Sequence, residues 1–168
     1  ETVKSRIPWL MLLMLSATFT GIVISSFEDS LAACSVLIGF IPMLMGTGGN
    51  CGNQSSVAVI RSLSLNEVGF GDLFRVVWKE SRVAVLCGVC LGGANFIKMM
   101  VVDRWLMHNP EVTPLVALVV CLTLMLTVVC AKIVGCTLPM AAEKVGIDPA
   151  VMAAPFITTI VDALSLLI

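Results

Sequence analysis

The sequence of 168 residues has few charged side chains and a single histidine. Charged residues make up 12% of the chain and hydrophobic residues 58%, whereas a water-soluble domain carries about a quarter charged residues. The ten Lys and Arg are balanced by eleven Asp and Glu and form no basic run, which argues against a nucleic-acid partner. One histidine, His108, is too few for a zinc or HExxH enzyme. These shortages indicate an integral membrane protein.

Five apolar stretches are long enough to cross a bilayer, which takes roughly 20 residues of helix. We therefore predict an all-α integral membrane protein with five transmembrane helices in one domain, residues 1–168. The expected helices cover about residues 8–27, 31–60, 75–102, 114–140 and 149–168. Five spans place the two termini on opposite sides of the membrane.

Basic residues are distributed unevenly between the expected connections. With the N-terminus inside, the outer connections hold Lys98 and Arg104, and the inner segments hold Lys4, Arg6, Arg61, Arg75, Lys79, Arg82 and Lys144. The positive-inside rule then predicts a plasma (inner) membrane protein with a cytoplasmic N-terminus and an external C-terminus. Lys132 lies within a span, near its inner end, and we expect it to reach the interface by snorkelling. We interpret inner acids such as Glu80 as solvated charge.

The cysteines and the glycine pair of the third span are interpreted as packing residues. All seven cysteines fall within or at the edge of apolar spans, where a disulfide framework is not expected. The CxxC motif of Cys87 and Cys90 has no second pair and no nearby histidine, so a core role is favoured over a redox or metal role. Gly88 and Gly92 have the spacing of a GxxxG packing motif in apolar surroundings.

The second expected span contains an unusually polar segment, residues 46–56, with four glycines, two asparagines and a glutamine. Asn50, Asn53 and Gln54 have no reason to face lipid, so we predict a polar lining with loosened or non-helical backbone. Carbonyl oxygens freed there can replace part of a cation's hydration shell. The alternative is close packing through Gly48 and Gly52, which is compatible with a lining role.

The last span carries a buried acid. Asp148 and Pro149 are a good helix start, and Asp162 lies 14 residues further on, about 21 Å along the helix. Thr158, Thr159 and Ser165 share its helical face and form a polar stripe with it. Acids inside spans are costly and usually mark an ion or proton path. The alternative is an aspartate satisfied by the two threonines or by Lys132.

These residues resemble the MgtE-type magnesium transporters. The run from Gly48 to Ser56 is similar to that family's GGNxGNQS signature, and Asp148-Pro149 with the run from Pro155 to Asp162 is similar to its last transmembrane helix. The resemblance implies a homodimer whose central ion path is lined by the second and fifth helices of each subunit. It further implies that Asp162 of both subunits binds magnesium and that Gly49 and Asn53 line the pore. Relatives of this kind place a cytosolic regulatory domain before the first span, so we expect the chain to be either the transport domain of a longer protein or a family member without that domain.

The chemistry of the stripe agrees with Mg²⁺ as the transported ion. Mg²⁺ dehydrates reluctantly and prefers oxygen ligands, so two carboxylates at a two-fold axis can hold the ion through its waters. Thiolate or imidazole would favour a softer metal, whereas this stripe is all oxygen. We expect Mg²⁺, with Mn²⁺, Co²⁺ or Ca²⁺ as secondary ions, to bind along Asp162, Thr158, Thr159, Gly49, Asn50 and Asn53.

Three other functions were weighed against a magnesium channel. A sodium- or proton-coupled exchanger could use the same Asp162, and sodium dependence of uptake separates the two. An intramembrane enzyme is disfavoured because the GxGD pattern is missing and no nucleophile–base pair can be assembled. A non-transporting assembly subunit, held together by its glycine motifs, would tolerate Asp162→Asn.

Overall fold

The computed structural model describes residues 2–27 and 35–168, and within these ranges the chain consists of helices and their connections. The five long helices are α1 (Thr2–Ser26), α4 (Ile41–Ser64), α5 (Leu73–Lys98), α6 (Pro114–Val145) and α7 (Pro149–Leu167). The short elements are helix α3 (Ser35–Ile38), a 3-10 turn (Phe70–Asp72) and a π-helical extension of α5 (Met99–Leu106). The prediction of an all-α protein is confirmed.

Several helix boundaries differ from the expected ones: α1 starts at Thr2 instead of residue 8, and α6 ends at Val145 instead of residue 140. The second expected helix began at residue 31, but residues 31–34 lie outside the described part, and α4 starts at Ile41 after a turn at Gly39 and Phe40. The third runs on through its π-helical extension to Leu106, so that part of the expected external connection is helical. Gly146 ends α6 with a φ of 80°, a left-handed conformation that glycine adopts without strain.

Two helical segments of the described chain are long and apolar enough to cross a membrane: Phe70–Leu106 and Pro114–Val145. Two shorter apolar stretches lie at Leu10–Ser26 and Phe156–Leu167. Helix α4 has the length but not the hydropathy, because its polar segment lies in its middle.

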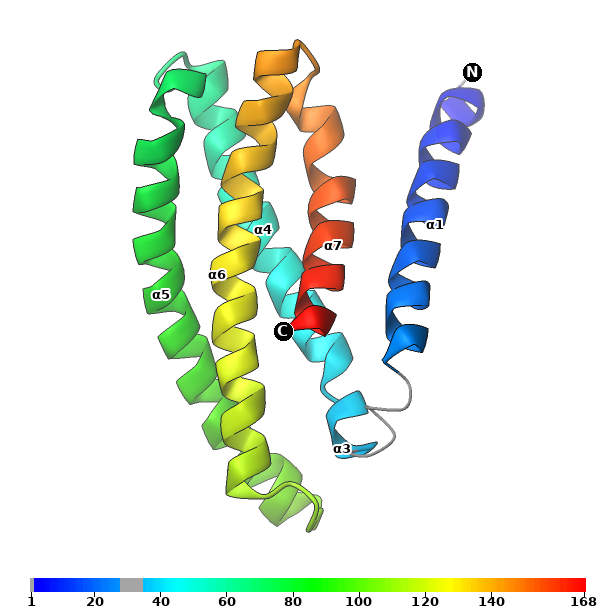
Figure 1. Cartoon of the computed structure of the whole chain (residues 1–168), viewed down its shortest axis with the longest axis vertical. Coiled ribbons are helices and arrows are strands. Elements are labelled where there is room, and N and C mark those ends of the chain that lie inside the picture. The colour runs from blue at the N-terminus through cyan, green and yellow to red at the C-terminus, as the bar shows by residue number, and fades with distance from the viewer. Residues whose placement is uncertain (1, 28–34) are drawn as a thin grey trace.

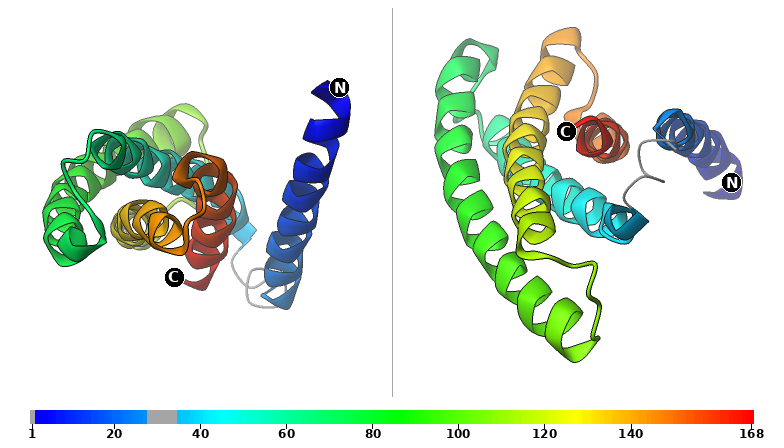
Figure 2. Two further views of the ribbon diagram at one scale, coloured as in Figure 1. Left: turned by 90° about the horizontal axis from the view of Figure 1, so that it is seen from above. Right: turned by 60° about the horizontal axis from the view of Figure 1, so that its bottom comes forward.

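Helix α6 lies at the centre of a bundle, where α4, α5 and α7 all pack against it and α4 also packs against α7 (Figure 1). Helix α1 contacts α7 and stands on the far side of α7 from α5 (Figure 2). Many of its apolar side chains are exposed, among them Leu10, Met14, Leu15 and Phe19.

Successive long helices run in opposite directions, so alternate connections gather at the same end of the bundle (Figure 1). The end with the α4–α5 and α6–α7 connections carries Arg61, Arg75, Lys79 and Lys144. The opposite end carries Lys98 and Arg104, and Lys98 forms an ion pair with Asp103, with 3.0 Å between Nζ and Oδ2. The two ends of the bundle therefore differ in charge, and the excess of basic residues lies at the end with the α4–α5 and α6–α7 connections.

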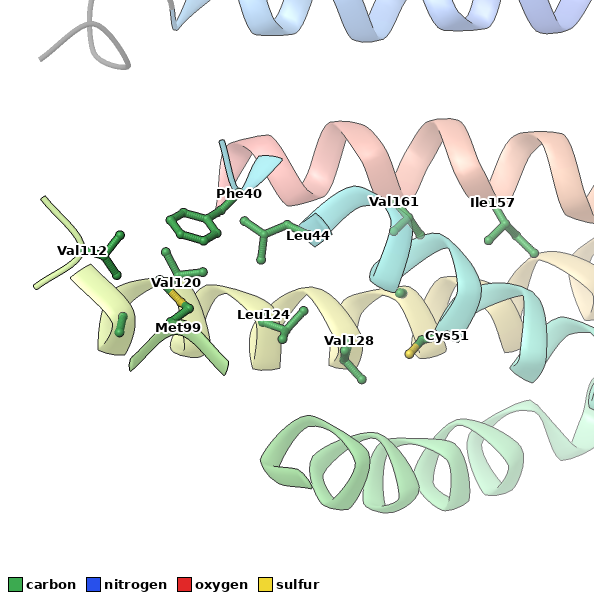
Figure 3. Packing of buried hydrophobic residues seen from close by; sticks show 12 residues of the cluster. Phe40, Leu44, Cys51, Met99, Val112, Val120, Leu124, Val128, Ile157 and Val161 are labelled. Atoms are coloured by element: carbon green, nitrogen blue, oxygen red, sulfur yellow. The ribbon is translucent and has the colours of Figure 1, made fainter. Parts of the chain in front are cut away.

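The hydrophobic core lies where α4, α6 and α7 meet (Figure 3). Val128 and Ala131 of α6 are fully buried, and Ile157 and Val161 of α7 point towards α4. Small residues at these crossings let the three backbones come close together.

Candidate functional site

The glycine–asparagine segment, residues 46–56, is a regular part of helix α4. The prediction of loosened or non-helical backbone is therefore wrong, and the segment's carbonyl groups belong to the helix. An interior glycine weakens a helix by about 1 kcal/mol relative to alanine. Three of the four glycines, Gly48, Gly49 and Gly52, are buried against neighbouring helices, and this packing supports the helix.

Gly48 and Gly52 face α6 and α7 at very short range. A methyl group at Gly48 would lie 2.6 Å from Cγ2 of Thr127 and 2.8 Å from Cγ1 of Val161. One at Gly52 would lie 2.8 Å from Cγ2 of Ile157 and 3.1 Å from a backbone oxygen of α6. Gly48 and Gly52 therefore serve close packing between helices, which was the alternative to a polar lining for this segment.

Gly49 and Asn53 lie on a different side of α4, next to α7. Gly49 is buried, and a methyl group there would meet Cγ2 of Thr158 at 3.7 Å, an ordinary contact. Asn53 is half-buried and lines a cavity of about 430 Å³ that reaches Ala150 near the start of α7. The structure thus brings Gly49 and Thr158 together across the α4–α7 contact. Asn50 is exposed, further round the helix.

Asp162 is half-buried on α7, one residue after the buried Val161. The structure shows no hydrogen bond or ion pair between its carboxylate and another described residue. Among the described residues, no group of three Asp, Glu, His or Cys side chains could hold a metal ion. Asp162 is the only acid within α7, so one chain supplies one carboxylate from this helix.

The polar stripe of α7 is shorter than expected. Thr158 and Thr159 are half-buried like Asp162, and each takes part in a polar or electrostatic interaction. Ser165 is buried instead, and its hydroxyl donates a 2.7 Å hydrogen bond to the carbonyl of Val161 in its own helix. Asp148 caps the start of α7 as predicted, with Oδ1 accepting from the amide of Ala150 at 2.9 Å.

Lys132 is buried in the bundle, with 5% of its surface exposed, so the expectation that it snorkels to the interface is wrong. Its Nζ donates to Oγ of Ser55 at 3.1 Å and lies 3.5 Å from Oε2 of Glu80. The expected solvation of Glu80 is wrong as well, because this carboxylate is largely buried and also accepts a 2.7 Å hydrogen bond from Ser55. Lys132 therefore does not pair with Asp162. The sequence signal for the contact of Lys132 with Ser55 and Glu80 was a lysine inside an apolar span.

The packing role of the third span's glycines is observed within the chain. Gly88 and Gly92 of α5 are buried against α6, where methyl groups would meet Met125 at 3.4 Å and 3.2 Å. The described cysteines are all free thiols. Cys87 is half-buried, but Cys90 is exposed, so a core role does not hold for Cys90 within one chain.

Comparison with known proteins finds relatives that match nearly the whole chain. The family model of the MgtE divalent cation transporters matches residues 41–168. The chain is 37% identical to the magnesium transporter MgtE of Thermus thermophilus over 98% of its length, and 36% identical to that of Bacillus subtilis over 97%. It is 32% identical to the Enterococcus faecalis protein of the same name over its whole length. The chain spans about a third of the length of these relatives, 34%, 34% and 35% respectively. It belongs to the MgtE family of divalent cation transporters.

Proposed function

We propose that this chain is the membrane domain of a magnesium transporter, in which Asp162 binds the hydrated ion on a path between two copies of the chain. The observation that carries the proposal is the position of Asp162: a half-buried carboxylate without an ion-pair partner among the described residues, on the helix that packs against Gly49 of α4. Curated relatives that match nearly the whole chain are named magnesium transporters.

A second copy of the chain supplies what one copy lacks. Mg²⁺ favours octahedral oxygen coordination and keeps several of its waters. A single carboxylate is a poor cage, whereas two at a two-fold axis give a site of charge −2 that holds the ion through its waters. Thr158, Thr159, Asn50 and Asn53 contribute neutral oxygens along the path, and Gly49 lies beside it.

The exposed surface of α4 supports a homodimer with the path at its axis. Asn50 and Gln54 are exposed on the single chain, and an amide facing lipid leaves its donors and acceptors unpaired. A second subunit, or water in a path between subunits, satisfies them. We infer that the α4 and α7 helices of the two chains enclose this path.

All five long helices cross the bilayer in this proposal, although in the described part of the chain only two segments meet the length and hydropathy expected of a span. The end rich in basic residues faces the cytoplasm, which leaves the N-terminus inside and the C-terminus outside. Because the relatives are about three times longer, we propose that cytosolic regulatory domains accompany this domain in the whole protein.

The test is Mg²⁺ flux into liposomes that contain the purified protein, with wild type, Asp162→Asn and Asp148→Asn measured side by side. Asp148→Asn is the matched control, since it removes a carboxylate from the same helix while asparagine caps a helix as well as aspartate does. We expect Asp162→Asn to abolish flux with folding intact and Asp148→Asn to retain it. Equal flux in all three proteins would remove Asp162 from the path.

The same liposomes distinguish a channel from a coupled exchanger. An imposed sodium or proton gradient changes Mg²⁺ flux only where the ions are coupled. We expect a passive path, with flux that follows the Mg²⁺ gradient alone. Competition by Mn²⁺, Co²⁺ and Ca²⁺ in this assay measures selectivity among the divalent ions.

A further inference from the structure

Three buried polar residues join three helices on the other side of α4. The hydroxyl of Ser55 in α4 donates to Oε2 of Glu80 in α5 at 2.7 Å and accepts from Nζ of Lys132 in α6 at 3.1 Å. The lysine and the glutamate also form an ion pair at 3.5 Å, and their side chains are 6% and 14% exposed. Ser55 itself is 1% exposed. We name Ser55, Glu80 and Lys132 the triad.

The triad is not explained by stability alone. Lys132 lies 13 residues before the end of α6 at Val145, about 20 Å along the helix, so its charge lies at membrane depth. Buried ion pairs are often no more stabilising than apolar side chains of the same volume, because both charges must be desolvated. Ionisable residues inside membrane domains are usually functional. What the triad adds is a fixed geometry between three helices.

Helix α4 benefits from such a fixed point, because next to the proposed path it meets α6 and α7 through glycines. Gly48 and Gly52 allow close approach to α6 and α7 but have no side chains that could interlock and define the rotation of the helix. Ser55 follows Asn53 by two residues, about 200° around the helix axis. The triad therefore holds α4 from the side opposite to Asn53.

Glu80 has space on its other side. It borders a cavity of about 270 Å³ between α4 and α5, which is also lined by Ser62, Glu67, Arg75 and Lys79. Without Ser55 and Lys132, the Glu80 carboxylate has room to turn into this polar cavity. The link from α4 to α5 and α6 would then be lost.

We propose that Ser55, Glu80 and Lys132 are positioning residues for ion transport, which fix the rotation of α4 and so present Gly49 and Asn53 to the ion path. This inference rests on the proposed function, since it assigns to the triad the placement of that path. It predicts that removing the triad weakens ion binding without unfolding the protein.

The test compares wild type with the double variant Glu80→Met/Lys132→Met, which removes both charges together and leaves neither buried alone. The readouts are the Mg²⁺ concentration for half-maximal flux, the melting temperature, and amide hydrogen exchange of residues 46–56. We expect the half-saturating Mg²⁺ concentration and the exchange rate of this segment each to rise about tenfold, which corresponds to about 1.4 kcal/mol. The melting temperature should stay close to that of wild type.

Two further variants act as control and rescue. Lys98→Met/Asp103→Met removes the other ion pair of the described chain, at the opposite end of α5, and should change neither readout of α4. The exchanged pair Glu80→Lys/Lys132→Glu restores opposite charges on α5 and α6, and a serine hydroxyl can bond to either partner. We expect it to recover most of the wild-type affinity, whereas each single exchange should not.

The outcomes separate this inference from the proposed function. If the double methionine variant keeps both the wild-type half-saturating concentration and the wild-type exchange of residues 46–56, the triad does not position α4 and the inference is wrong. Should that variant not fold, Ser55→Ala decides the same question, since it detaches α4 and leaves the Lys132–Glu80 pair in place. Absence of Mg²⁺ flux in wild type would contradict the proposed function, while hydrogen exchange would still decide the triad.

Discussion

At Gly135, helix α6 comes so close to α4 that no side chain fits between them. A methyl group on Gly135 would collide with the backbone carbonyl of Gly52, which cannot move without shifting the helix. Gly48 and Gly52 meet α6 and α7 at similarly short range. The position of the proposed path therefore depends on these glycines, although they bind no ion themselves.

Gly135→Ala should lower the free energy of unfolding by about 1–3 kcal/mol, the usual effect of overpacking. Gly21→Ala is the control, because a methyl group there has nothing within 4 Å, and alanine in place of an interior helical glycine gains about 0.5–1 kcal/mol. Thermal unfolding in detergent or nanodiscs measures both. Equal melting temperatures for the two variants would show that α4 and α6 are not in such close contact.

Single residues could be predicted where their chemistry is unusual for their surroundings. Asp162 and the glycine–asparagine segment are unusual in an apolar span, and both belong to the α4–α7 region that the structure brings together at Gly49 and Thr158. Lys132 is unusual as well, but the sequence does not show where its side chain points. A lysine in an apolar span can reach the interface or pair with a buried acid, and the sequence pattern is the same in both cases. The buried position and partners of Glu80 could be recognised only from the structure, because those partners lie 25 and 52 residues away in the sequence.

Among the helices, α4 shows how far local preference can be overridden. Four glycines in eleven residues argue against a helix, and the sequence predicted a break there. The helix is continuous because the glycines allow contact with α6 and α7 that bulkier residues would prevent. The long apolar helices were predicted well, with boundaries within a few residues at most ends. The extension of α5 to Leu106 was missed because Asp103 and Arg104 resemble loop residues.

The contact between α5 and α6 can be tested with two adjacent glycines. Gly92→Leu should force α5 away from α6, because even a methyl group there lies 3.2 Å from Met125. Gly93→Leu points into open space and should leave the melting temperature unchanged or slightly higher. We expect a loss of about 1–3 kcal/mol for the first substitution alone. A similar loss for both would place Gly93 in a contact that a single chain does not contain.

Across the whole molecule, the main asymmetry is that of charge between the two ends of the bundle. The positive-inside rule predicts an orientation from this asymmetry, and the alternating helix directions place the connections at the two ends in turn (Figure 1). The sequence was sufficient for this pattern, since it depends only on the order of spans. It was not sufficient for the packing around α6, because apolar helices carry little pattern that indicates their neighbours.

The orientation can be measured with epitope tags in two connections. A tag after Asn66, between α4 and α5, should be reached by antibody only once the cell membrane is permeabilised. A tag after Asn109, between α5 and α6, should be accessible on intact cells. The opposite accessibility would reverse the orientation, and accessibility of both or neither would contradict a membrane crossing by α5.

The order in which the three triad residues occur in the sequence has a consequence for membrane insertion. A lysine at the centre of a span costs at least about 2.5–3.5 kcal/mol when a helix enters the bilayer alone. Glu80 precedes Lys132 by 52 residues and Ser55 precedes it by 77. The ribosome therefore completes both partners of this lysine before the lysine itself emerges. Synthesis from the N-terminus supplies the countercharge first, so α6 enters the membrane beside helices that can already neutralise it.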